Sequence, residues 1–371
     1  MNLKIERETL LEKAQAVSKI ILKKNAIAIY DHILFHIWTE GVTLTASNGN
    51  TQIQTTTQCK SGHTFKFCVP AEVFISTIRY MREQEVKIAY TETVDGKNTS
   101  RVLMVTCGKS KYKIACEDPD IFPIIQTTRT EKEMLLDAGE FKQAFSTAES
   151  FVPAQSDLPS FTGVHIKHTG EGNILIEGGD RTSIGRASFR ARSLTGFDEV
   201  IVLKDSIPVE VLDKSEKLNV LQHDNSLQVI SDQFTIITLL MKEKYPDTDK
   251  VFKTQPDTGM SLNCVQVIDC ISRLKGYVGE SGGVSVAFGK DIVMQAVDAG
   301  RNNHGEEVIE AECPLDVTTG FNPVELLHIF SKAGSDQVMT HYSGQKNPFF
   351  FTPEGNDSTV KYKFLLAPMT L

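Results

Sequence analysis

The sequence predicts an α+β protein assembled from six similar units, each with one helix on an antiparallel sheet. One pattern, in which a strand ends and an amphipathic helix begins, recurs six times along the 371 residues. Between these copies apolar and polar residues alternate with a period of two, which is typical of half-buried strands. Roughly three or four strands follow each helix, and this order favours antiparallel sheets over alternating parallel strands and helices.

The copies of the pattern mark where the helices are expected to begin. Proline suits the first turn of a helix, where a missing N–H costs nothing, and Gly334 suits the end of the last helix. The prolines in question are Pro70, Pro208 and Pro323. The first helix is expected to turn four apolar residues toward a core: Leu10, Ala14, Val17 and Ile21. The six copies are KIERETLLEKAQ, FCVPAEVFISTIRYM, LLDAGEFKQAFSTA, VLKDSIPVEVLDK, SLNCVQVIDCISRL and TGFNPVELLHIFSK.

The strands are expected wherever the period of two is clearest. Each such segment can bury one face and expose the other. The segments are VTLTAS, VKIAY, VLMVTCG, YKIAC, GVHIKH, NILIEG, LQVIS, FTIITLLM, VSVAF, IVMQAV and VKYKFLL.

A second, longer period groups the units in pairs. An apolar strand runs into proline about every 125 residues, in YKIACEDPDIFP, ITLLMKEKYPD and KYKFLLAPM. Polar, proline-bearing stretches at 117–135 and 243–258 suit linkers. The sequence therefore predicts three domains, at residues 1–124, 125–252 and 253–371.

The net charge of −8 excludes a protein that binds nucleic acid over its whole surface, because that affinity comes from Lys and Arg on phosphates. The expected helices nevertheless hold a small excess of basic residues, and the rest of the chain holds the acidic excess. This distribution indicates a local basic surface, with an ordinary solvated helix face as the alternative. Basic residues on the outer helix faces include Arg79, Arg82, Lys142, Lys214, Arg273, Lys275 and Lys332.

The seven cysteines are odd in number, scattered, and never in a CxxC pair, which is typical of reduced thiols in a cytoplasmic protein. The N-terminus MNLKIERETL is charged where a signal peptide needs an apolar run. No stretch approaches the roughly 20 apolar residues of a membrane span. We therefore expect a cytoplasmic protein without a membrane partner.

The titratable residues form no pattern that indicates an enzyme. His32 and His36 have the spacing of helical metal ligands, but DHILFHIW alternates like a strand and lacks a neighbouring Glu. The Gly-rich GESGGVS joins a helix to a strand, the reverse of a phosphate-binding loop. No HExxH or Walker-type lysine occurs. We expect no catalytic residue, no metal and no cofactor.

Five segments resemble the bacterial DNA sliding clamp, the beta subunit of DNA polymerase III, and lie in the same order along the whole chain. They are MNLKIERETLLEKAQAVSK, CGKSKYKIACEDPDIFP, KEKYPDTDKVF, GFNPVELLHIF and LLAPMTL. The resemblance implies three similar clamp-type domains, each with two helices and antiparallel sheets, that form half of a closed ring. It also implies a cytoplasmic, nucleoid-associated homodimer, without catalytic activity, that acts as a processivity factor in DNA replication.

The partners that the resemblance implies are double-stranded DNA, held without regard to sequence, the DNA polymerase catalytic subunit, the clamp loader, and other clamp-binding replication and repair proteins. Lys24 matches the family's basic DNA contact after the first helix. Gln155 and Ser156 fall in a loop of the second domain that also touches DNA. The basic helix residues named above complete the expected DNA-binding surface.

The resemblance further implies an apolar groove for partner peptides between the second and third domains. Its expected walls are Phe161, Ile184, Pro246, Val251, Leu365, Pro368 and Met369, and its expected rim is Gly179, Thr182, Asn322 and Ala367. The implied ring interface joins Tyr112 and Ile114 of one subunit to Tyr277 and Val278 of the next. Ordinary core packing is the alternative for each of these residues.

Several segments depart from the family pattern. GGDRTSIG stands where the family has T-D-G-H-R-L-A, so a His and an Arg of the groove are lost. The terminal LAPMTL has Ala and Thr where Met and Arg are frequent, and KKNAIAIY lacks a basic-proline turn. The chain is therefore either a divergent main clamp or a specialised paralogue. The alternative function is that of a clamp-fold scaffold that gathers proteins without loading on DNA.

Overall fold

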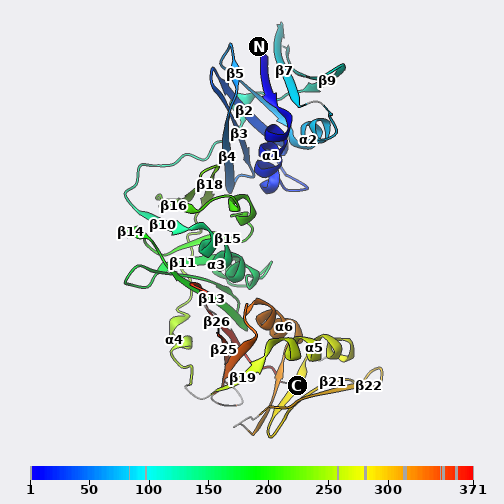
Figure 1. Cartoon of the computed structure of the whole chain (residues 1–371), viewed down its shortest axis with the longest axis vertical. Helices are drawn as coiled ribbons and strands as arrows, with labels where there is room; N and C mark the ends of the chain where they lie inside the picture. Colours follow the sequence, from blue (N-terminus) through cyan, green and yellow to red (C-terminus); the bar gives the residue numbers. More distant parts are fainter. Residues whose placement is uncertain are drawn as a thin grey trace. The chain divides into compact units, whose positions relative to one another are not determined.

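The computed structural model describes residues 2–82, 84–96, 98–256, 259–279, 282–311, 316–342, 344, 347–355 and 358–370. Its architecture is α+β, and all of the strand pairings between its described strands are antiparallel (Figure 1). The expectation of antiparallel sheets is thus confirmed. All eleven segments in which we expected strands contain strand residues.

The chain divides into two compact units. The first comprises Met1–Gly139, Arg192–Asp198 and Asp205–Leu240, and the second comprises Glu140–Ala191, Glu199–Lys204 and Met241–Leu371. Residues 125–252 contribute to both, so the boundaries of three sequential domains stay a prediction.

The first unit contains a five-stranded sheet and a nine-stranded sheet. The five-stranded sheet has the order β5 (Lys60–Ser61), β1 (Asn2–Glu6), β7 (Glu85–Asp95), β8 (Asn98–Cys107) and β9 (Ser110–Ala115). The nine-stranded sheet has the order β14 (Ser193–Thr195), β10 (Glu133–Asp137), β16 (Lys217–Gln222), β17 (Ser226–Ile230), β18 (Phe234–Leu239), β4 (Thr51–Gln58), β3 (Gly41–Ser47), β2 (His32–Trp38) and β6 (Phe65–Pro70).

Helices α1 (Arg7–Val17) and α2 (Ala71–Arg79) pack against each other in this unit. They bury Leu10 and Phe74, and Phe74 meets Phe35 of β2 edge to face at 5.1 Å. The expected α1 was too long, because the chain tightens into the 3-10 turn η1 (Ser18–Ile20) and leaves Ile21 beyond the helix. The remaining turns are η2 (Ala28–Asp31), η3 (Pro119–Ile121) and η5 (Val209–Leu212).

The fourth expected helix is wrong in type. Residues after Pro208 form only the 3-10 turn η5, in which Val209, Val211 and Leu212 are buried. Two β-branched valines alternate with polar residues here, and such a sequence has little preference for a regular helix. Pro70 and Pro323 do stand at the start of α-helices, and Gly334 has the positive φ of +64° expected after the last helix.

The second unit contains an eight-stranded sheet and a four-stranded sheet. The eight-stranded sheet has the order β15 (Val200–Leu203), β11 (Gly163–His168), β12 (Asn173–Gly179), β13 (Ser183–Arg190), β26 (Lys361–Leu366), β25 (Phe349–Glu354), β24 (Gln337–His341) and β19 (Gly259–Asn263). The four-stranded sheet has the order β22 (Asn303–Ile309), β21 (Ile292–Asp298), β20 (Val284–Phe288) and β23 (Val317–Phe321).

The helices of this unit are α3 (Ala138–Ser150, whose first two residues belong to the other unit), α4 (Asp249–Phe252), α5 (Cys264–Leu274) and α6 (Pro323–Lys332), with turns η4 (Pro159–Thr162) and η6 (Lys275–Tyr277). Helices α5 and α6 lie side by side (Figure 1). Among the described residues, none of the helices has the length and apolar content that crossing a membrane requires.

Candidate functional site

The hairpin of β12 and β13 and the C-terminal strand bring five of the predicted groove residues together. Gly179 pairs with Ile184 across the hairpin, and Ile184 pairs with Leu365 on β26. The backbone N–H of Ala367 donates to the carbonyl of Thr182 at 2.7 Å, which ties the C-terminal segment to the hairpin turn. These contacts follow from the order β12-β13-β26 in the sheet.

An apolar cluster lies where these strands meet the segment that contains α4. Ile184 and Leu365 are buried with Phe252 and Phe350, and the half-buried Val251 packs against them. Three of the predicted groove walls therefore share one cluster. Phe252 and Phe350 belong to it but were not among the residues that the sequence predicted.

Phe161 belongs to a neighbouring group in the same unit. It is buried with Ile201 and Tyr245, and its ring meets that of Tyr245 edge to face at 5.6 Å. Tyr245 directly precedes Pro246, whose carbonyl accepts from the N–H of Thr248 at 2.9 Å. The structure thus connects Phe161 with Pro246 through Tyr245 rather than through the cluster around Ile184.

The C-terminal segment also reaches the start of α6. The N–H of Met369 donates to the carbonyl of Gly320 at 2.9 Å, and Pro368 before it is half-buried. Asn322 caps α6, because its side-chain oxygen accepts from the N–H of Val324 at 2.9 Å. The rim residue Asn322 therefore has a structural role in starting this helix.

Two acidic groups lie near Thr182 in the hairpin turn: Asp180 of the turn, which also carries Arg181, and Glu325 of α6. Asp180 accepts from the N–H of Thr182 at 2.7 Å, and the Thr182 hydroxyl lies 3.1 Å from the Glu325 carboxylate on α6. Burial and the nearby Asp180 charge raise the pKa of Glu325. A cavity of ≈ 430 Å³ adjoins the turn, between the end of α3 and α6, with Phe151 and His328 among its walls.

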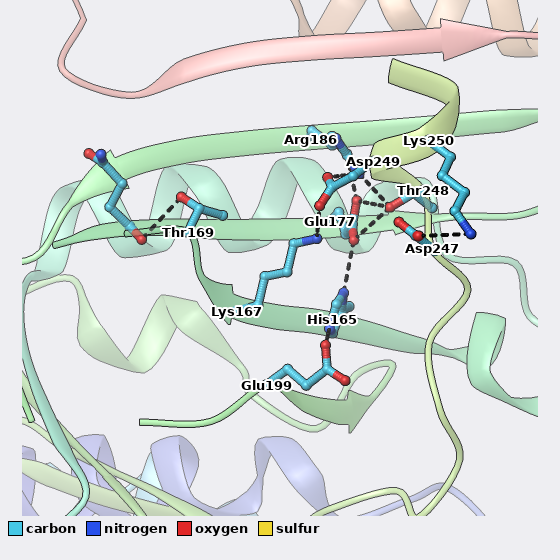
Figure 2. A network of polar contacts seen from close by, with 11 residues as sticks. His165, Lys167, Thr169, Glu177, Arg186, Glu199, Asp247, Thr248, Asp249 and Lys250 are labelled. Atoms are coloured by element: carbon cyan, nitrogen blue, oxygen red, sulfur yellow. Dashed lines mark hydrogen bonds and ion pairs between the residues drawn. The ribbon is translucent and has the colours of Figure 1, made fainter. Parts of the chain in front are cut away.

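A buried polar network lies on the eight-stranded sheet (Figure 2). His165, Glu177 and Arg186 are paired in register across β11, β12 and β13. The imidazole Nδ1 of His165 lies 2.8 Å from one Glu177 oxygen, and Nε of Arg186 donates to the other at 2.6 Å. Burial alone would raise the pKa of Glu177, but the hydrogen bond from His165 and the charge of Arg186 hold it below the usual value.

The residues of the first unit that we predicted to contact DNA lie at helix ends and in loops. Lys24, Arg79 and Arg82 are exposed: Lys24 between η1 and η2, Arg79 at the last residue of α2, and Arg82 just beyond it. Lys214 follows η5, and its ammonium lies 2.6 Å from the Glu12 carboxylate of α1. That ion pair offsets the positive charge that we expected Lys214 to present.

In the second unit the predicted DNA contacts lie on helices and in the loop after α3. They are Lys142 on α3, Gln155 and Ser156 in that loop, Arg273 and Lys275 at the end of α5, and Lys332 at the end of α6. The Arg273 guanidinium binds both oxygens of Glu307 on β22, at 2.6 and 2.8 Å. The sequence did not foresee this pairing because Glu307 lies on a strand 34 residues further along.

The residues predicted for a subunit interface lie at sheet edges. Tyr112 and Ile114 are on β9, the last strand of its sheet; Tyr112 is 43% exposed, whereas Ile114 is only 5% exposed. Tyr277, which is 42% exposed, lies at the end of η6 and close to Gly305 on the edge strand β22, and the half-buried Val278 follows it. Their role in an interface stays a prediction.

Within the described ranges, no group of three or more His, Cys, Asp or Glu side chains is placed to hold a metal ion. His32 and His36, which have the spacing of helical metal ligands, lie instead on strand β2. The buried Glu177 binds a histidine, an arginine and a threonine hydroxyl. The site is therefore built for apolar contact and for internal charge pairing.

Comparisons with known proteins agree with this architecture. Residues 1–126 match the family described as DNA polymerase III beta subunit, N-terminal domain. The beta sliding clamp of Streptococcus pneumoniae is 21% identical over 367 residues, which cover 95% of each chain. That of Staphylococcus aureus is 19% identical over 379 residues, which cover 97% of this chain and 98% of the relative.

The fold matches over the full length as well. The beta subunit of DNA polymerase from Streptococcus pyogenes superimposes with a TM-score of 0.90 at 22% identity, and 100% of each chain is covered. The fold is that of the DNA sliding clamps. The chain is similar to the bacterial beta sliding clamps over nearly its full length at low sequence identity, and the resemblance predicted from its sequence is confirmed.

Proposed function

We propose that this chain is a DNA sliding clamp, a processivity factor that encircles duplex DNA and tethers polymerases to it. The observation that carries the proposal is the clamp fold over the whole chain, together with full-length relatives named beta sliding clamp. The residence time of a ring on DNA does not depend on its affinity for DNA. Topology keeps the protein on DNA, while weak, salt-screened phosphate contacts let it slide.

The finer architecture of the proposal is three clamp domains per chain, at 1–124, 125–252 and 253–371, with two chains closing the ring. The sheets support this division. Strand β4 pairs with β18, and β13 pairs with β26, so each large sheet combines strands from two consecutive predicted domains. A chain of domains joined by continuous sheets suits an arc that a second copy completes.

The proposed DNA surface uses basic residues near helix ends. Lys24, Arg79 and Arg82 are exposed and suited to phosphate contact, and Gln155 is an exposed loop residue. Lys142, Ser156, Lys275 and Lys332 complete the proposal, together with Lys214 and Arg273, whose charges are offset by acidic partners. No base readout is required for such a role.

The proposed partner site is the apolar cluster around Ile184, Leu365 and Val251, with the C-terminal segment beside it. Buried apolar area stabilises an inserted side chain by about 25 cal/mol per Å², so a peptide with aliphatic or aromatic anchors suits this site. The proposed partners are the polymerase catalytic subunit, the clamp loader and other replication and repair proteins. The chain would act without catalysis of its own, in the cytoplasm at the nucleoid.

Topological retention on DNA tests the proposal. The protein is loaded on nicked circular DNA with the clamp loader of its own organism, and the complex is washed at high salt. We expect retention on the circle, because salt screens phosphate contacts but cannot open a ring, and release once the DNA is linearised. A protein that leaves circles and linear DNA equally fast at high salt would be a scaffold that is not linked to DNA.

A further inference from the structure

The segment Tyr245–Phe252, which includes α4, is fastened to the eight-stranded sheet by the buried polar network of His165, Glu177 and Arg186. The Thr248 hydroxyl donates to Glu177 at 2.8 Å and accepts from the Arg186 guanidinium. Figure 2 shows Thr248 and the Glu177 carboxylate facing one another at the centre of the network. Thr248 is buried, so its hydroxyl has little access to solvent.

Further contacts of the network reach both sides of Thr248. Asp249 accepts from Nζ of Lys167 at 2.8 Å and from the Arg186 guanidinium at 2.9 Å. At the ends of the segment, the Tyr245 ring stacks on His165 at 4.4 Å, and the Arg186 guanidinium lies 3.9 Å from the centre of the Phe252 ring. One row of sheet residues therefore contacts the segment at its start, middle and end.

A segment of this length does not hold its own shape. Helix α4 has four residues, and helices so short depend on tertiary contacts. Buried charges cost free energy when they leave water, so their pairing adds little net stability but does select one arrangement. The arrangement selected here places Val251 and Phe252 against Ile184 and Leu365.

We propose that the network of His165, Glu177 and Arg186, which we call the clasp, positions the segment Tyr245–Phe252. The Thr248 hydroxyl is the central contact between the clasp and the segment. In this role the network sets where Val251 and Phe252 stand in the apolar cluster, and so shapes the site for a partner peptide. Thr248 and Glu177 are positioning residues that touch no partner themselves. The role in shaping a partner site rests on the proposed function, whereas the positioning of the segment does not.

Replacement of Thr248 by Val and by Ser tests the clasp, because Val keeps the shape without the hydroxyl and Ser keeps the hydroxyl. Thr169→Val is the matched control: it makes the same change at an exposed turn, where the hydroxyl only meets the Asn173 carbonyl at 3.4 Å. Asp249→Asn is a second variant that weakens the clasp at a half-exposed position. Circular dichroism verifies that each variant is folded.

Two measurements are made on the full-length protein. Hydrogen exchange follows the backbone amides of residues 247–252, which report opening of the segment directly. Fluorescence anisotropy follows binding of a labelled clamp-binding peptide from the polymerase catalytic subunit of the same organism. The first measurement does not depend on the function of the site, whereas the second one does.

We expect Thr248→Val to speed exchange in this segment about tenfold and to weaken peptide binding about tenfold, the factor that corresponds to about 1.4 kcal/mol. Thr248→Ser is expected to stay within about twofold of the unchanged protein, Thr169→Val to have no effect, and Asp249→Asn to show a smaller increase in exchange.

Unchanged exchange in Thr248→Val would overturn the clasp. Faster exchange with unaltered peptide affinity would show that the clasp does not shape the partner site, and so would overturn its positioning role. If the unchanged protein does not bind the peptide at all, the proposed function fails, while the exchange of Thr248→Val against Thr248→Ser still decides the clasp.

Discussion

At the scale of one residue, the burial and the partners of Glu177 could not be predicted from the linear sequence. Its side chain has no exposed surface, although a glutamate in NILIEG would ordinarily face water. Its partners stand 12 residues before it and 9 residues after it, on different strands. Only the register of β11, β12 and β13 places the three residues in one row, and a period of two does not reveal that register.

The acid stability of the second unit is expected to depend on Glu177. A carboxyl group whose pKa is lowered by folding adds stability above its unfolded pKa, here about 4.5, and loses it as the pH falls through the folded value. The free energy of unfolding of the unchanged protein should therefore hold at neutral pH and decrease below about pH 4.5. Glu177→Gln should be less stable by about 3 kcal/mol at pH 7 and should show a weaker decrease in acid.

Urea denaturation followed by circular dichroism, repeated between pH 3 and pH 7, measures both effects. Glu199→Gln is a suitable control, because that carboxylate is largely exposed and lies 3.5 Å from His165. Equal dependence on pH in the unchanged protein and in Glu177→Gln would contradict the assignment.

At the scale of elements, the sequence predicted the type of most elements but few of their neighbours. Periodicity identified the strands because apolar and polar residues alternate along a half-buried strand. The 3-10 turn η5 was not predicted, because its buried valines are compatible with more than one backbone conformation. The pairings of β4 with β18 and of β13 with β26 join segments far apart in the chain, which no local pattern encodes. For the same reason Phe350, on β25, was missed as a member of the apolar cluster.

The predicted groove illustrates the difference between residues and elements. The structure places Ile184, Val251 and Leu365 in one apolar cluster, whereas Phe161 lies with Tyr245 in another. A matching position along the chain predicts which element a residue belongs to. Which side chains fill the space between elements depends on their volumes, and this chain places its own aromatic rings there.

The N-terminus of α6 offers a prediction at this scale. Asn322→Ala should lower the free energy of unfolding by about 1 kcal/mol, because the N–H of Val324 loses its side-chain acceptor. Asn322→Ser should lose only a few tenths, since serine caps helices about as well as asparagine does. Urea denaturation compares the two variants, and equal losses in both would exclude capping as the role of Asn322.

At the scale of the whole molecule, charge is the property that composition describes least well. A net charge of −8 and a count of basic residues on helices predicted a local basic surface. The structure pairs Lys214 with Glu12 and Arg273 with Glu307, so two of the expected cations are offset. Exposed pairs of this kind contribute little stability, but they reduce the positive field that a passing duplex would meet.

Assembly provides the last prediction. Among the described strands β9 is the last of its sheet, so one of its sides presents N–H and C=O groups that a further strand can pair with, and Tyr112 is an exposed aromatic residue on it. An edge of this kind can be continued by a strand of a second copy, and a charge placed on it blocks such pairing. We therefore expect the unchanged protein to have twice the chain mass of 41.2 kDa, and Tyr112→Glu to have the mass of a single chain, as measured by light scattering.

Val94→Glu is the matched control for this variant. Val94 is an exposed apolar residue of the same sheet, but it pairs with Thr99, beyond the part of β8 that β9 accompanies. A charge there leaves the edge of β9 intact, so the double mass should persist. Since a single chain cannot close a ring, Tyr112→Glu should also lose retention on circular DNA at high salt, whereas Val94→Glu should keep it. A Tyr112→Glu protein that still has the double mass would place the subunit contact elsewhere than on β9.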